Sequence, residues 1–407
     1  MRRIIKILSN CFFNFITAFL NLFVWRDKRV WLLGSWMGEK YADNTRFLYD
    51  YLKSSDSNIN FKKIIWVTRD KKVLNDLVSL GLNDVCLIGS KKSLYYHLKA
   101  GVHFVCNSVG DNLQADIDSR FSFGAKKIQL WHGVGIKACG KMCRKKQGGL
   151  KNWFHDNVID FLLKPGHWKK AYFLTTSAEN TRVAIYDYGV SKKRIIQASY
   201  PRYCWNPRLL TDNEKTILSQ LKTIRSNYKI VLFLPTFKKS IEQYTLPNSL
   251  PGFSAFLKTN NIFWIQKKHP ADTQLFLGEK QDNVITIDYN FDINLIYEYI
   301  DVLLTDYSSA TTDAIVKNKV TIEYCPDFDY YENEDRGFVN DFTKYHVGHL
   351  IKDPDCLFEC ISKNLVLDSK NRYTHNQVKE FLIGDQNWTI EEIVKEIIKK
   401  TKIRGML

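Results

Sequence analysis

Residues 303–313 read LLTDYSSATTD, and they run from a predicted strand into the start of a predicted helix. The apolar residues before Thr305 indicate a short buried strand, and the hydroxyl-rich residues after it are typical of a helix start. Backbone N–H groups and the helix dipole at such a start attract anions, and the hydroxyls of Ser308 and Ser309 add donors. An ordinary serine N-cap would give the same dipeptide. The stretch predicts an α/β unit whose turn is either a phosphate site or a simple cap.

The same alternation of short strands and helices continues on both sides of this stretch, which predicts parallel sheets covered by helices on both faces. We expect two doubly wound, Rossmann-like domains facing a cleft, at 28–215 and 216–407, with ligands beyond the carboxyl ends of the strands. The expected strands are Val30–Leu33, Ile64–Val67, Val85–Ile88, Val102–Cys106, Ile128–Trp131, Phe173–Thr176, Ile195–Gln197, Ile230–Leu234, Phe263–Gln266, Val284–Ile287, Val302–Thr305 and Val320–Tyr324. The expected helices include Thr45–Leu52 after an Asn44 cap, Lys72–Leu80, Lys91–Ala100 after a Ser90 cap, Asp212–Arg225 and Thr389–Ile403.

The amino-terminal segment 1–27 contains the most apolar run of the chain, residues 4–25, which is about long enough to span a bilayer. Polar residues nevertheless recur in it at three- and four-residue steps, which favours an amphipathic helix; they are Lys6, Asn10, Asn14, Thr17 and Asn21. Basic residues flank the run, namely Arg2, Arg3, Arg26, Lys28 and Arg29. We expect a helix in the membrane interface with its bases facing anionic headgroups. A helix packed on its own domain and a true membrane span are the alternatives.

The composition excludes a disordered chain and points to anionic partners. Lys and Arg total 59 against 43 Asp and Glu, which gives a formal net charge of +16. Such a charge suits nucleic acid, an anionic membrane or phosphate-bearing substrates. The 9 cysteines include no CxxC motif, so we expect free thiols in a reducing compartment and no metal site at Cys139/Cys143 or Cys356/Cys360.

Polar motifs follow several of the predicted strands. His132 ends one strand and precedes two glycines, so it is either a proton acceptor or a histidine held by a backbone carbonyl. Lys267-Lys268-His269-Pro270 closes another strand with cations that suit phosphate oxygens, or it is a solvated turn. Arg336-Gly337-Phe338 offers an arginine for a phosphate, or a surface salt bridge. Pro235-Thr236-Phe237 also lies at a strand end.

In order along the chain, these motifs resemble one family, the CDP-glycerol glycerophosphotransferases that prime or polymerise teichoic acids, with relatives that build capsular polyol-phosphate polymers. The resemblance runs from about Trp31 to Phe342, and Thr305-Asp306-Tyr307-Ser308-Ser309 is its most specific part. Its other motifs are Gly34-Ser35, Gly38, Asp43-Asn44, Leu48-Tyr49, Trp131-His132-Gly133, Tyr200-Pro201-Arg202, Pro235-Thr236-Phe237, Lys267-Lys268-His269-Pro270 and Arg336-Gly337-Phe338. The chain departs from the family pattern at Val134-Gly135, Ser199, Tyr203-Cys204 and Val320, which affects substrate recognition more than reaction class.

The resemblance implies a GT-B-like fold and transfer of a polyol phosphate, glycerol phosphate first, from CDP-glycerol or CDP-ribitol to an acceptor hydroxyl, with CMP leaving. It implies an acceptor-side domain at 28–215 and a donor-binding domain at 216–407. The implied catalytic residues are His132 and His269. The implied donor residues are Pro235, Thr236, Lys267, His269, Thr305, Asp306, Ser308, Ser309, Arg336 and Gly337, and the acceptor-side residues are Gly133, Lys137 and Arg202. No acidic cluster is typical of a dedicated metal site, so we expect no required cofactor, although Mg²⁺ is compatible with these residues.

A cluster of basic residues surrounds the His132 segment and suggests a track for a phosphate polymer or a diphosphate-lipid acceptor, unless it is ordinary surface; it comprises Lys126, Lys127, Lys137, Lys141, Arg144, Lys145, Lys146 and Lys151. We expect a peripheral enzyme on the cytoplasmic face of a bacterial membrane. A GT-B glycosyltransferase with a nucleotide-sugar donor is the alternative enzyme. A non-catalytic binder of nucleic acid or anionic lipid is the least favoured, because no nucleic-acid module is recognisable, and we expect no nucleic-acid partner.

Overall fold

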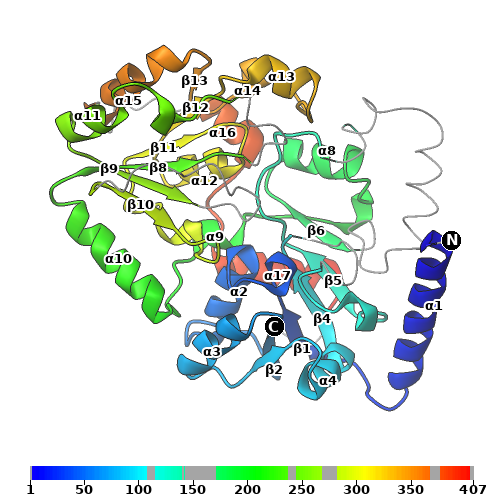
Figure 1. Ribbon diagram of the computed structural model, residues 1–407. Helices are drawn as coiled ribbons and strands as arrows, with labels where there is room; N and C mark the ends of the chain where they lie inside the picture. Colours follow the sequence, from blue (N-terminus) through cyan, green and yellow to red (C-terminus); the bar gives the residue numbers. More distant parts are fainter. Residues whose placement is uncertain are drawn as a thin grey trace. The chain divides into compact units, whose positions relative to one another are not determined.

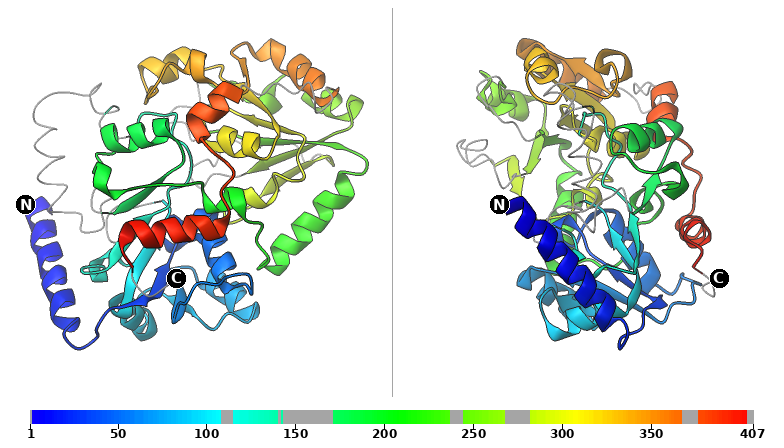
Figure 2. Two further views of the ribbon diagram at one scale, coloured as in Figure 1. Left: turned by 180° about the vertical axis from the view of Figure 1, so that it is seen from behind. Right: turned by 90° about the vertical axis from the view of Figure 1, so that its right-hand side faces the viewer.

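The computed structural model describes residues 2–107, 115–139, 142, 171–236, 244–267, 282–366 and 376–403. The chain divides into two compact units. The first unit comprises Met1–His132, Gly140–Thr211 and Asp385–Leu407, and the second comprises Gly133–Cys139 and Asp212–Gly384. Each unit holds one parallel sheet with helices around it (Figures 1 and 2).

The sheet of the first unit has the strand order β3-β2-β1-β4-β5-β6-β7, and every recorded pairing in it is parallel. Its central strands are nearly continuous apolar runs, as expected for strands covered on both faces, with Trp31, Trp66 and Phe104 fully buried. The strands are β1 (Asp27–Leu33), β2 (Lys63–Thr68), β3 (Val85–Leu87), β4 (Ala100–Val105), β5 (Lys126–Gln129), β6 (Tyr172–Thr175) and β7 (Ile195–Gln197).

The helices of the first unit are capped where their sequences provide a cap. Asp70 accepts hydrogen bonds from the backbone at the start of α3, and Ser90 does the same for α4, as expected from the sequence. The helices are α1 (Arg2–Leu20), α2 (Asp43–Lys53), α3 (Lys71–Ser79), α4 (Lys91–Lys99), α8 (Ala178–Tyr186), α9 (Pro201–Cys204) and α17 (Ile390–Thr401). The described residues of this unit also form the short 3₁₀ turns η1 (Trp36–Gly38), η2 (Ser119–Phe121) and η5 (Lys192–Arg194).

The sheet of the second unit repeats the same order with six strands, β10-β9-β8-β11-β12-β13. Its strands are β8 (Lys229–Leu234), β9 (Ile262–Lys267), β10 (Val284–Ile287), β11 (Val302–Thr305), β12 (Val320–Tyr324) and β13 (His349–Ile351). Its helices are α10 (Asp212–Ile224), α11 (Phe253–Thr259), α12 (Ala310–Val316), α13 (Phe328–Asn333), α14 (Phe342–Tyr345), α15 (Leu357–Val366) and α16 (Asn376–Ile383). The strand order of both sheets reverses beside the first strand of the unit, so each unit has a switch point where ligands bind in such folds.

The expected α/β fold with two doubly wound sheets is therefore confirmed. Strand β13 was not expected from the sequence. The expected strand Ile128–Trp131 ends at Gln129 instead, since Trp131 takes a left-handed backbone conformation with φ 59°. Asn44 was expected to cap α2, but the N-cap is Ala42, because the Asn44 side chain is used elsewhere, as described below.

Two segments depart from the expected division at residue 215. Helix α17 packs on β7 and α9 of the first unit and buries Ile393, Val394 and Ile397, although the sequence placed it with the second half (Figure 2). The segment Gly133–Cys139 belongs to the second unit, because its backbone pairs with Gly337–Val339. The period of a helix shows which of its faces is apolar but not which surface that face covers.

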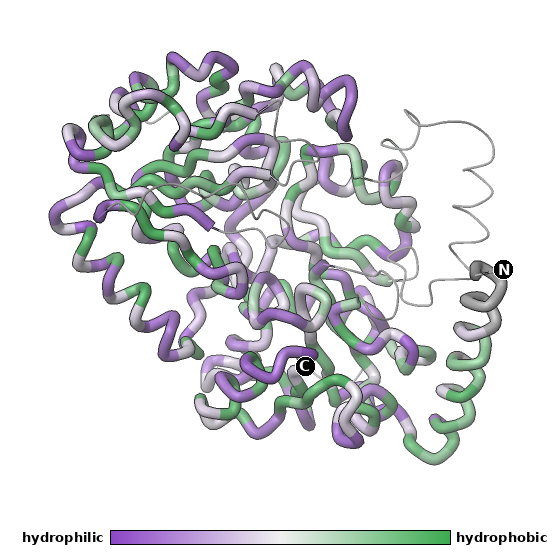
Figure 3. Tube along the Cα trace, viewed as in Figure 1, coloured by the Kyte–Doolittle hydropathy of each residue, from purple (hydrophilic) through white to green (hydrophobic). Residues whose placement is uncertain are grey.

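Helix α1 packs on η2 through its polar side. The hydroxyl of Thr17 is buried and donates to the carbonyl oxygen of Arg120 at 3.0 Å, and the Phe13 ring meets the edge of Phe121 with centroids 6.1 Å apart. The large apolar side chains that follow on the other side are between 52% and 74% exposed; they are Phe12, Phe15, Phe19, Leu22, Phe23 and Trp25. Figure 3 shows this part of the chain as a hydrophobic stretch. Within the described ranges, no helix has the length and apolarity that crossing a membrane requires.

Arg26 does not face solvent as a membrane-binding base, and that expectation is wrong. Its guanidinium donates to the carbonyl oxygens of His97 at 2.9 Å, Ala100 at 2.7 Å and Phe121 at 2.9 Å. The last carbonyls of α4 have no partner within the helix, so the arginine satisfies them. Burial lowers the pKa of Arg26 to about 10. Lys28 and Arg29 remain exposed.

Candidate active site

The expected motifs gather at the switch point of each unit. In the first unit, this is the carboxyl edge beside β1 and β4, where Leu33 pairs with Phe104. In the second unit, it is the edge beside β8 and β11, where Leu234 pairs with Thr305. The architecture therefore explains why motifs far apart in the sequence meet at two places.

His132 is the central side chain at the carboxyl edge of the first sheet. Its Nδ1 lies 3.1 Å from the carbonyl oxygen of Cys106, and its ring lies between those of Trp36 and Trp131, with centroids 5.8 Å and 4.4 Å away. A carbonyl only accepts hydrogen bonds, so Nδ1 carries the hydrogen and the neutral ring keeps its lone pair on Nε2. The carbonyl contact expected for a structural histidine is present, and it is also the contact that orients a base.

The backbone next to His132 is strained. Trp131 has φ 59°, a conformation that costs a bulky residue about 1–3 kcal/mol. Two side chains hold it there: Gln129 Oε1 accepts the Trp131 N–H at 3.0 Å, and Asn44 Nδ2 donates to the Trp131 carbonyl at 2.8 Å. Strain that other residues hold in place is typical of functional sites, and here it fixes the direction of His132.

A buried ion pair joins three motifs around His132. The guanidinium of Arg202 pairs with the carboxylate of Asp43, and both side chains are almost fully buried. Arg202 Nη2 also donates to the His132 carbonyl at 3.3 Å, and Asn44 Oδ1 accepts the Arg202 N–H at 3.3 Å. The carboxylate of Asp43 also accepts the indole N–H of Trp36 at 3.1 Å. Arg202 was expected to contact the acceptor, but its enclosure suits a residue that holds the site together.

Asp116 is a residue that the motifs did not reveal. Its side chain is fully buried, and its carboxylate accepts the backbone N–H groups of Met37, Cys106 and Asn107, each at 2.8 Å. No sequence signal marks it, because its partners are backbone groups of other loops. Asp43, Asn44 and Gln129 were likewise absent from the expected site residues, although Asp43 and Asn44 lie in a motif of the resemblance.

At the carboxyl edge beside β8 and β11, Thr236 and Asp306 form a hydrogen-bonded pair. The backbone N–H of Thr236 donates to the Asp306 carboxylate at 2.9 Å, and its hydroxyl donates to the same group at 2.5 Å. The Thr305 hydroxyl donates to the Leu234 carbonyl. Asp306 is fully buried, so its carboxylate fixes the turn after β8 and does not offer itself to an anionic donor.

A short backbone pairing joins the segment of Lys137 to the segment that follows Arg336. The Ala138 N–H donates to the Gly337 carbonyl at 3.1 Å, and residues 137 and 338 form an antiparallel bridge. Lys137 Nζ lies 3.4 Å from the Thr236 hydroxyl oxygen, and both residues belong to the second unit as divided above, Lys137 with the segment Gly133–Cys139. Gly337 has φ 65°, a conformation that favours glycine. In the described part of the chain, Arg336 makes no ion pair, which removes the surface salt bridge as its role there.

An aromatic cluster supports the turn after β11. The Tyr307 hydroxyl donates to Asp327 at 2.9 Å, and its ring stacks on Tyr331 with centroids 4.0 Å apart. Burial raises the pKa of both tyrosines, so neither ionises near neutral pH. Next to this cluster, Ser309 is the N-cap of the seven-residue helix α12 without a side-chain cap bond, and the Ser308 hydroxyl oxygen accepts the Ala310 N–H at 3.3 Å.

The remaining expected residues divide into placed and unplaced ones. Lys267 ends β9 at the same edge, and its Nζ donates to the Phe291 carbonyl at 2.7 Å. Of the basic cluster, Lys126 donates to the carbonyl of Thr401 in the first unit. His269 lies outside the described residues, as do Phe237, Lys268, Pro270, Lys141, Arg144, Lys145, Lys146 and Lys151.

Metal-binding side chains do not cluster in the described ranges, where no group of three His, Cys, Asp or Glu residues could hold an ion. The eight cysteines that the structure describes are free thiols, and Cys143 lies outside it. Burial raises the pKa of the Cys106 thiol well above its usual value, so this neighbour of His132 stays neutral.

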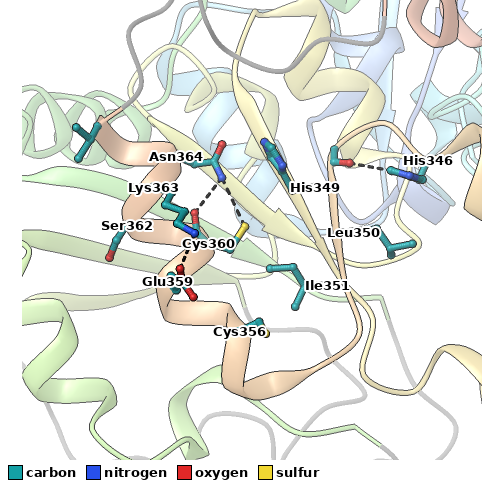
Figure 4. Close-up of a pocket in the computed structure, with 12 residues that line it drawn as sticks. His346, His349, Leu350, Ile351, Cys356, Glu359, Cys360, Ser362, Lys363 and Asn364 are labelled. Atoms are coloured by element: carbon teal, nitrogen blue, oxygen red, sulfur yellow. Dashed lines mark hydrogen bonds and ion pairs between the residues drawn. The ribbon is translucent and has the colours of Figure 1, made fainter.

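A cavity of about 1060 Å³ lies elsewhere in the second unit, between β13 and α15, and none of the expected site residues lines it. Figure 4 shows Asn364 donating to Cys360 and Lys363 paired with Glu359 on its wall. The one lysine in its lining, Lys363, is paired with Glu359. The strand-end motifs therefore mark a different place from this cavity.

Comparisons with known proteins agree with the motifs. The profile of the family described as CDP-Glycerol:Poly(glycerophosphate) glycerophosphotransferase matches residues 15–395. The chain is 23% identical to the teichoic acid poly(glycerol phosphate) polymerase of Bacillus spizizenii over 385 residues, covering 92% of this chain and 93% of that protein. It is 23% identical to the teichoic acid glycerol-phosphate transferase of Staphylococcus aureus, covering 85% and 86%. The wall teichoic acid polymerase TagF has the same fold, with a TM-score of 0.64 at 18% identity, covering 97% of this chain and 94% of that one.

Proposed function

This chain belongs to the CDP-glycerol:poly(glycerophosphate) glycerophosphotransferase family, and on that premise we propose that it transfers a polyol phosphate from a CDP-polyol donor to an acceptor hydroxyl in teichoic acid synthesis, releasing CMP. Glycerol phosphate is the favoured group, because the two relatives described above carry it in their names. The observation that carries the proposal is the contact of His132 Nδ1 with the Cys106 carbonyl, which orients the ring as a proton acceptor, while Asn44 and Arg202 hold the backbone at Trp131 and His132.

The proposed reaction is a displacement at phosphorus. The acceptor hydroxyl oxygen forms a bond to the phosphorus atom that bears the polyol, and the bond from that phosphorus to the bridging oxygen of CMP breaks. The hydroxyl proton passes to Nε2 of His132, and CMP leaves with the electron pair of the broken bond. A positioned base contributes about 10²–10⁴-fold to such steps. His269 is proposed as a second catalytic group, by resemblance alone.

The second unit is proposed to bind the donor. Lys137, Lys267 and Arg336 supply positive charge for the pyrophosphate, and the Thr236, Ser308 and Ser309 hydroxyls supply hydrogen bonds. Charges fixed in advance at the leaving group stabilise the transition state without rearrangement. Pro235, Thr305, Asp306 and Gly337 shape the turns that hold these groups. The set requires no metal ion in this proposal, and turnover should survive a chelator.

We propose that the enzyme works at the cytoplasmic face of the membrane, on a membrane-linked or polymeric acceptor. The exposed side of α1 and the following residues up to Trp25 support this, because apolar side chains of that size are rarely left in water without a partner. Lys28 and Arg29 follow directly and suit anionic headgroups. Teichoic acid is favoured over a capsular polymer by the names of the relatives.

A donor panel tests the function. CDP-glycerol, CDP-ribitol, UDP-sugars and GDP-sugars are each incubated with an acceptor lipid and with an acceptor oligomer. We expect CMP release from a CDP-polyol, first from CDP-glycerol, with product length separating one addition from many. Release of UDP or GDP alone would favour a glycosyltransferase and contradict the proposal.

The His132→Ala variant tests the role of the base. It should lose at least about 100-fold in kcat, because proton transfer to the imidazole is removed. Its thermal unfolding should stay near that of the wild type, since the His132 ring is only partly buried. Full turnover by this variant would refute the base assignment.

A further inference from the structure

The carboxylate of Asp116 is enclosed at the carboxyl edge of the first sheet. Oδ2 accepts the N–H groups of Cys106 and Asn107 at 2.8 Å each, and Oδ1 accepts the N–H of Met37 at 2.8 Å. The side chain is fully buried. A buried carboxylate that accepts several backbone hydrogen bonds is stabilised in its charged form.

One of those N–H groups is chemically linked to His132. The N–H of Asn107 and the C=O of Cys106 belong to the same peptide group. That carbonyl oxygen is the one that accepts the Nδ1–H of His132 at 3.1 Å. The three groups therefore form one line of hydrogen bonds, from the carboxylate through the amide to the imidazole.

We propose that Asp116 is a positioning residue for His132, acting through the Cys106–Asn107 peptide group as a carboxylate–amide–imidazole relay. The inference rests on the proposed role of His132 as base. The carboxylate replaces the direct carboxylate partner that catalytic histidines have in hydrolase triads, with an amide inserted between the two. In this arrangement it never contacts substrate.

Three physical effects follow from the relay. The carbonyl fixes the Nδ1–H tautomer, which leaves Nε2 to receive the proton. A charged group at one end of a hydrogen-bonded chain polarises the amide and strengthens the bond at the other end. The negative charge also stabilises the imidazolium that forms when the acceptor proton arrives. Removing the charge should therefore make His132 a weaker base.

Other charged or titratable groups of the described residues lie near the same ring. Asp43 and Arg202 neutralise each other in their ion pair, and the guanidinium reaches only the His132 backbone carbonyl. Lys40 Nζ lies over the Trp36 ring, 4.8 Å from its centroid. Arg69 Nε donates to the Met37 carbonyl oxygen at 3.1 Å. The Cys106 thiol stays neutral, as described above.

The pH dependence of turnover in Asp116→Asn tests the relay. The variant removes the charge and keeps the size of the side chain. We expect kcat to fall about 10-fold, with the KM for CDP-glycerol changed less than about 2-fold, because only the base is weakened. The acidic limb of the pH profile of kcat/KM should move to lower pH by about 0.5–1.5 units, from Coulomb attraction at an effective dielectric constant of about 20. Asp116→Glu should restore part of kcat and return the limb towards its wild-type position.

Asp50→Asn is the matched control. Asp50 is also buried in the first unit, and its carboxylate accepts the backbone N–H groups of Arg208 and Leu209 at 2.9 Å and 2.6 Å. Its loss should lower thermal stability without moving the acidic limb. If Asp116→Asn loses activity and stability as Asp50→Asn does, with the limb unmoved, Asp116 is a structural residue and the relay is wrong.

His132→Gln separates the failure of this inference from that of the proposed function. Full turnover in His132→Gln would refute the base and the relay together. An inactive His132→Gln combined with an unmoved limb in Asp116→Asn would refute the relay alone.

If Asp116→Asn fails to fold, the relay can still be tested by nitrogen NMR of wild-type protein that carries nitrogen-labelled histidine. The ring signal that His132→Gln removes must show hydrogen on Nδ1 in the neutral ring. Hydrogen on Nε2 instead would overturn the relay.

Discussion

Single residues in the first unit show how a buried charge can organise a site without touching a ligand. The Asp43–Arg202 pair lies in the interior, whereas the Lys215–Asp212 pair of α10 is mostly exposed. Buried pairs are costly to break because the surviving charge has lost its water, while exposed pairs contribute little. The two pairs therefore allow a direct comparison in the same chain.

We expect Arg202→Met to lower the free energy of unfolding by about 3–5 kcal/mol, since Asp43 would remain buried and unpaired. The double change Asp43→Asn with Arg202→Met should recover part of that loss. Lys215→Met should change the free energy by less than about 1 kcal/mol. Urea unfolding measures all three, and an Arg202→Met protein as stable as the Lys215→Met control would contradict the assignment.

His97 and His103 predict that the protein is sensitive to mild acid. Both are fully buried, and burial lowers the pKa of each below the usual value. Nδ1 of His97 lies 2.7 Å from the Ser93 carbonyl, and its Nε2 accepts the Asp118 N–H at 2.9 Å, so the neutral ring has both partners. The unfolded chain binds protons below about pH 6.5 that the folded rings do not, so stability should fall as the pH drops below that value.

The free energy of unfolding should fall with pH by at most about 1.4 kcal/mol per pH unit for each histidine. Urea unfolding from pH 7.5 down to the pH of aggregation measures it, and His103→Gln should flatten it. His346 works in the opposite direction, because its contact with buried Glu323 raises the pKa of His346. Its contribution is present below about pH 6.5 and is lost as the pH rises through the raised pKa. A stability that is flat from pH 7 to pH 5 would contradict the assignment of His97 and His103.

At the scale of elements, α1 has an inverted amphipathic character relative to an ordinary surface helix. Its Thr17 faces the protein, whereas Phe12, Phe15 and Phe19 are exposed. The spacing of polar residues predicted the helix and its two sides. Which side packs depends on the carbonyl oxygen of Arg120, about a hundred residues further along the chain. The same contact supports the alternative of a helix packed on its own domain, whereas the helix in the membrane interface stays a prediction.

We expect the variant Phe15→Ser, Phe19→Ser, Phe23→Ser to lose binding to anionic vesicles, by about 10-fold or more for each ring removed from the interface. Sedimentation with vesicles of anionic phospholipid measures the binding. Val78→Ser with Tyr186→Ser is the control, since these side chains are exposed elsewhere in the first unit. Equal binding by both variants would rule α1 out as the membrane contact.

At the scale of the whole molecule, the net charge of +16 favours binding of a phosphate-bearing acceptor. If the basic cluster near His132 carries a phosphate polymer, binding releases counterions and weakens steeply with salt. We expect kcat/KM for a polymeric acceptor to fall at least about 10-fold between 50 and 200 mM salt, by the counterion relation. A short acceptor should show a smaller fall. Identical salt slopes for the two acceptors would contradict a polymer track.

The sequence by itself determined the strands other than β13, about half of the described helices and the identity of the strand-end motifs. Buried parallel strands read as short apolar runs, and caps such as Ser90 act on neighbouring residues, so both are local and visible in a window of the chain. The order of the motifs along the chain was enough to recognise the resemblance to the family. These features needed no knowledge of contacts between distant residues.

Only the tertiary structure decided which groups act together. Asp116 grips backbone N–H groups of other loops, Arg202 turns inward to Asp43, and Lys137 joins Thr236 in the second unit. α17 returns to the first unit, although the chain has already passed through the second. Such choices are set by which surface remains open when strands assemble, a property of the whole sheet that no local pattern of residues records.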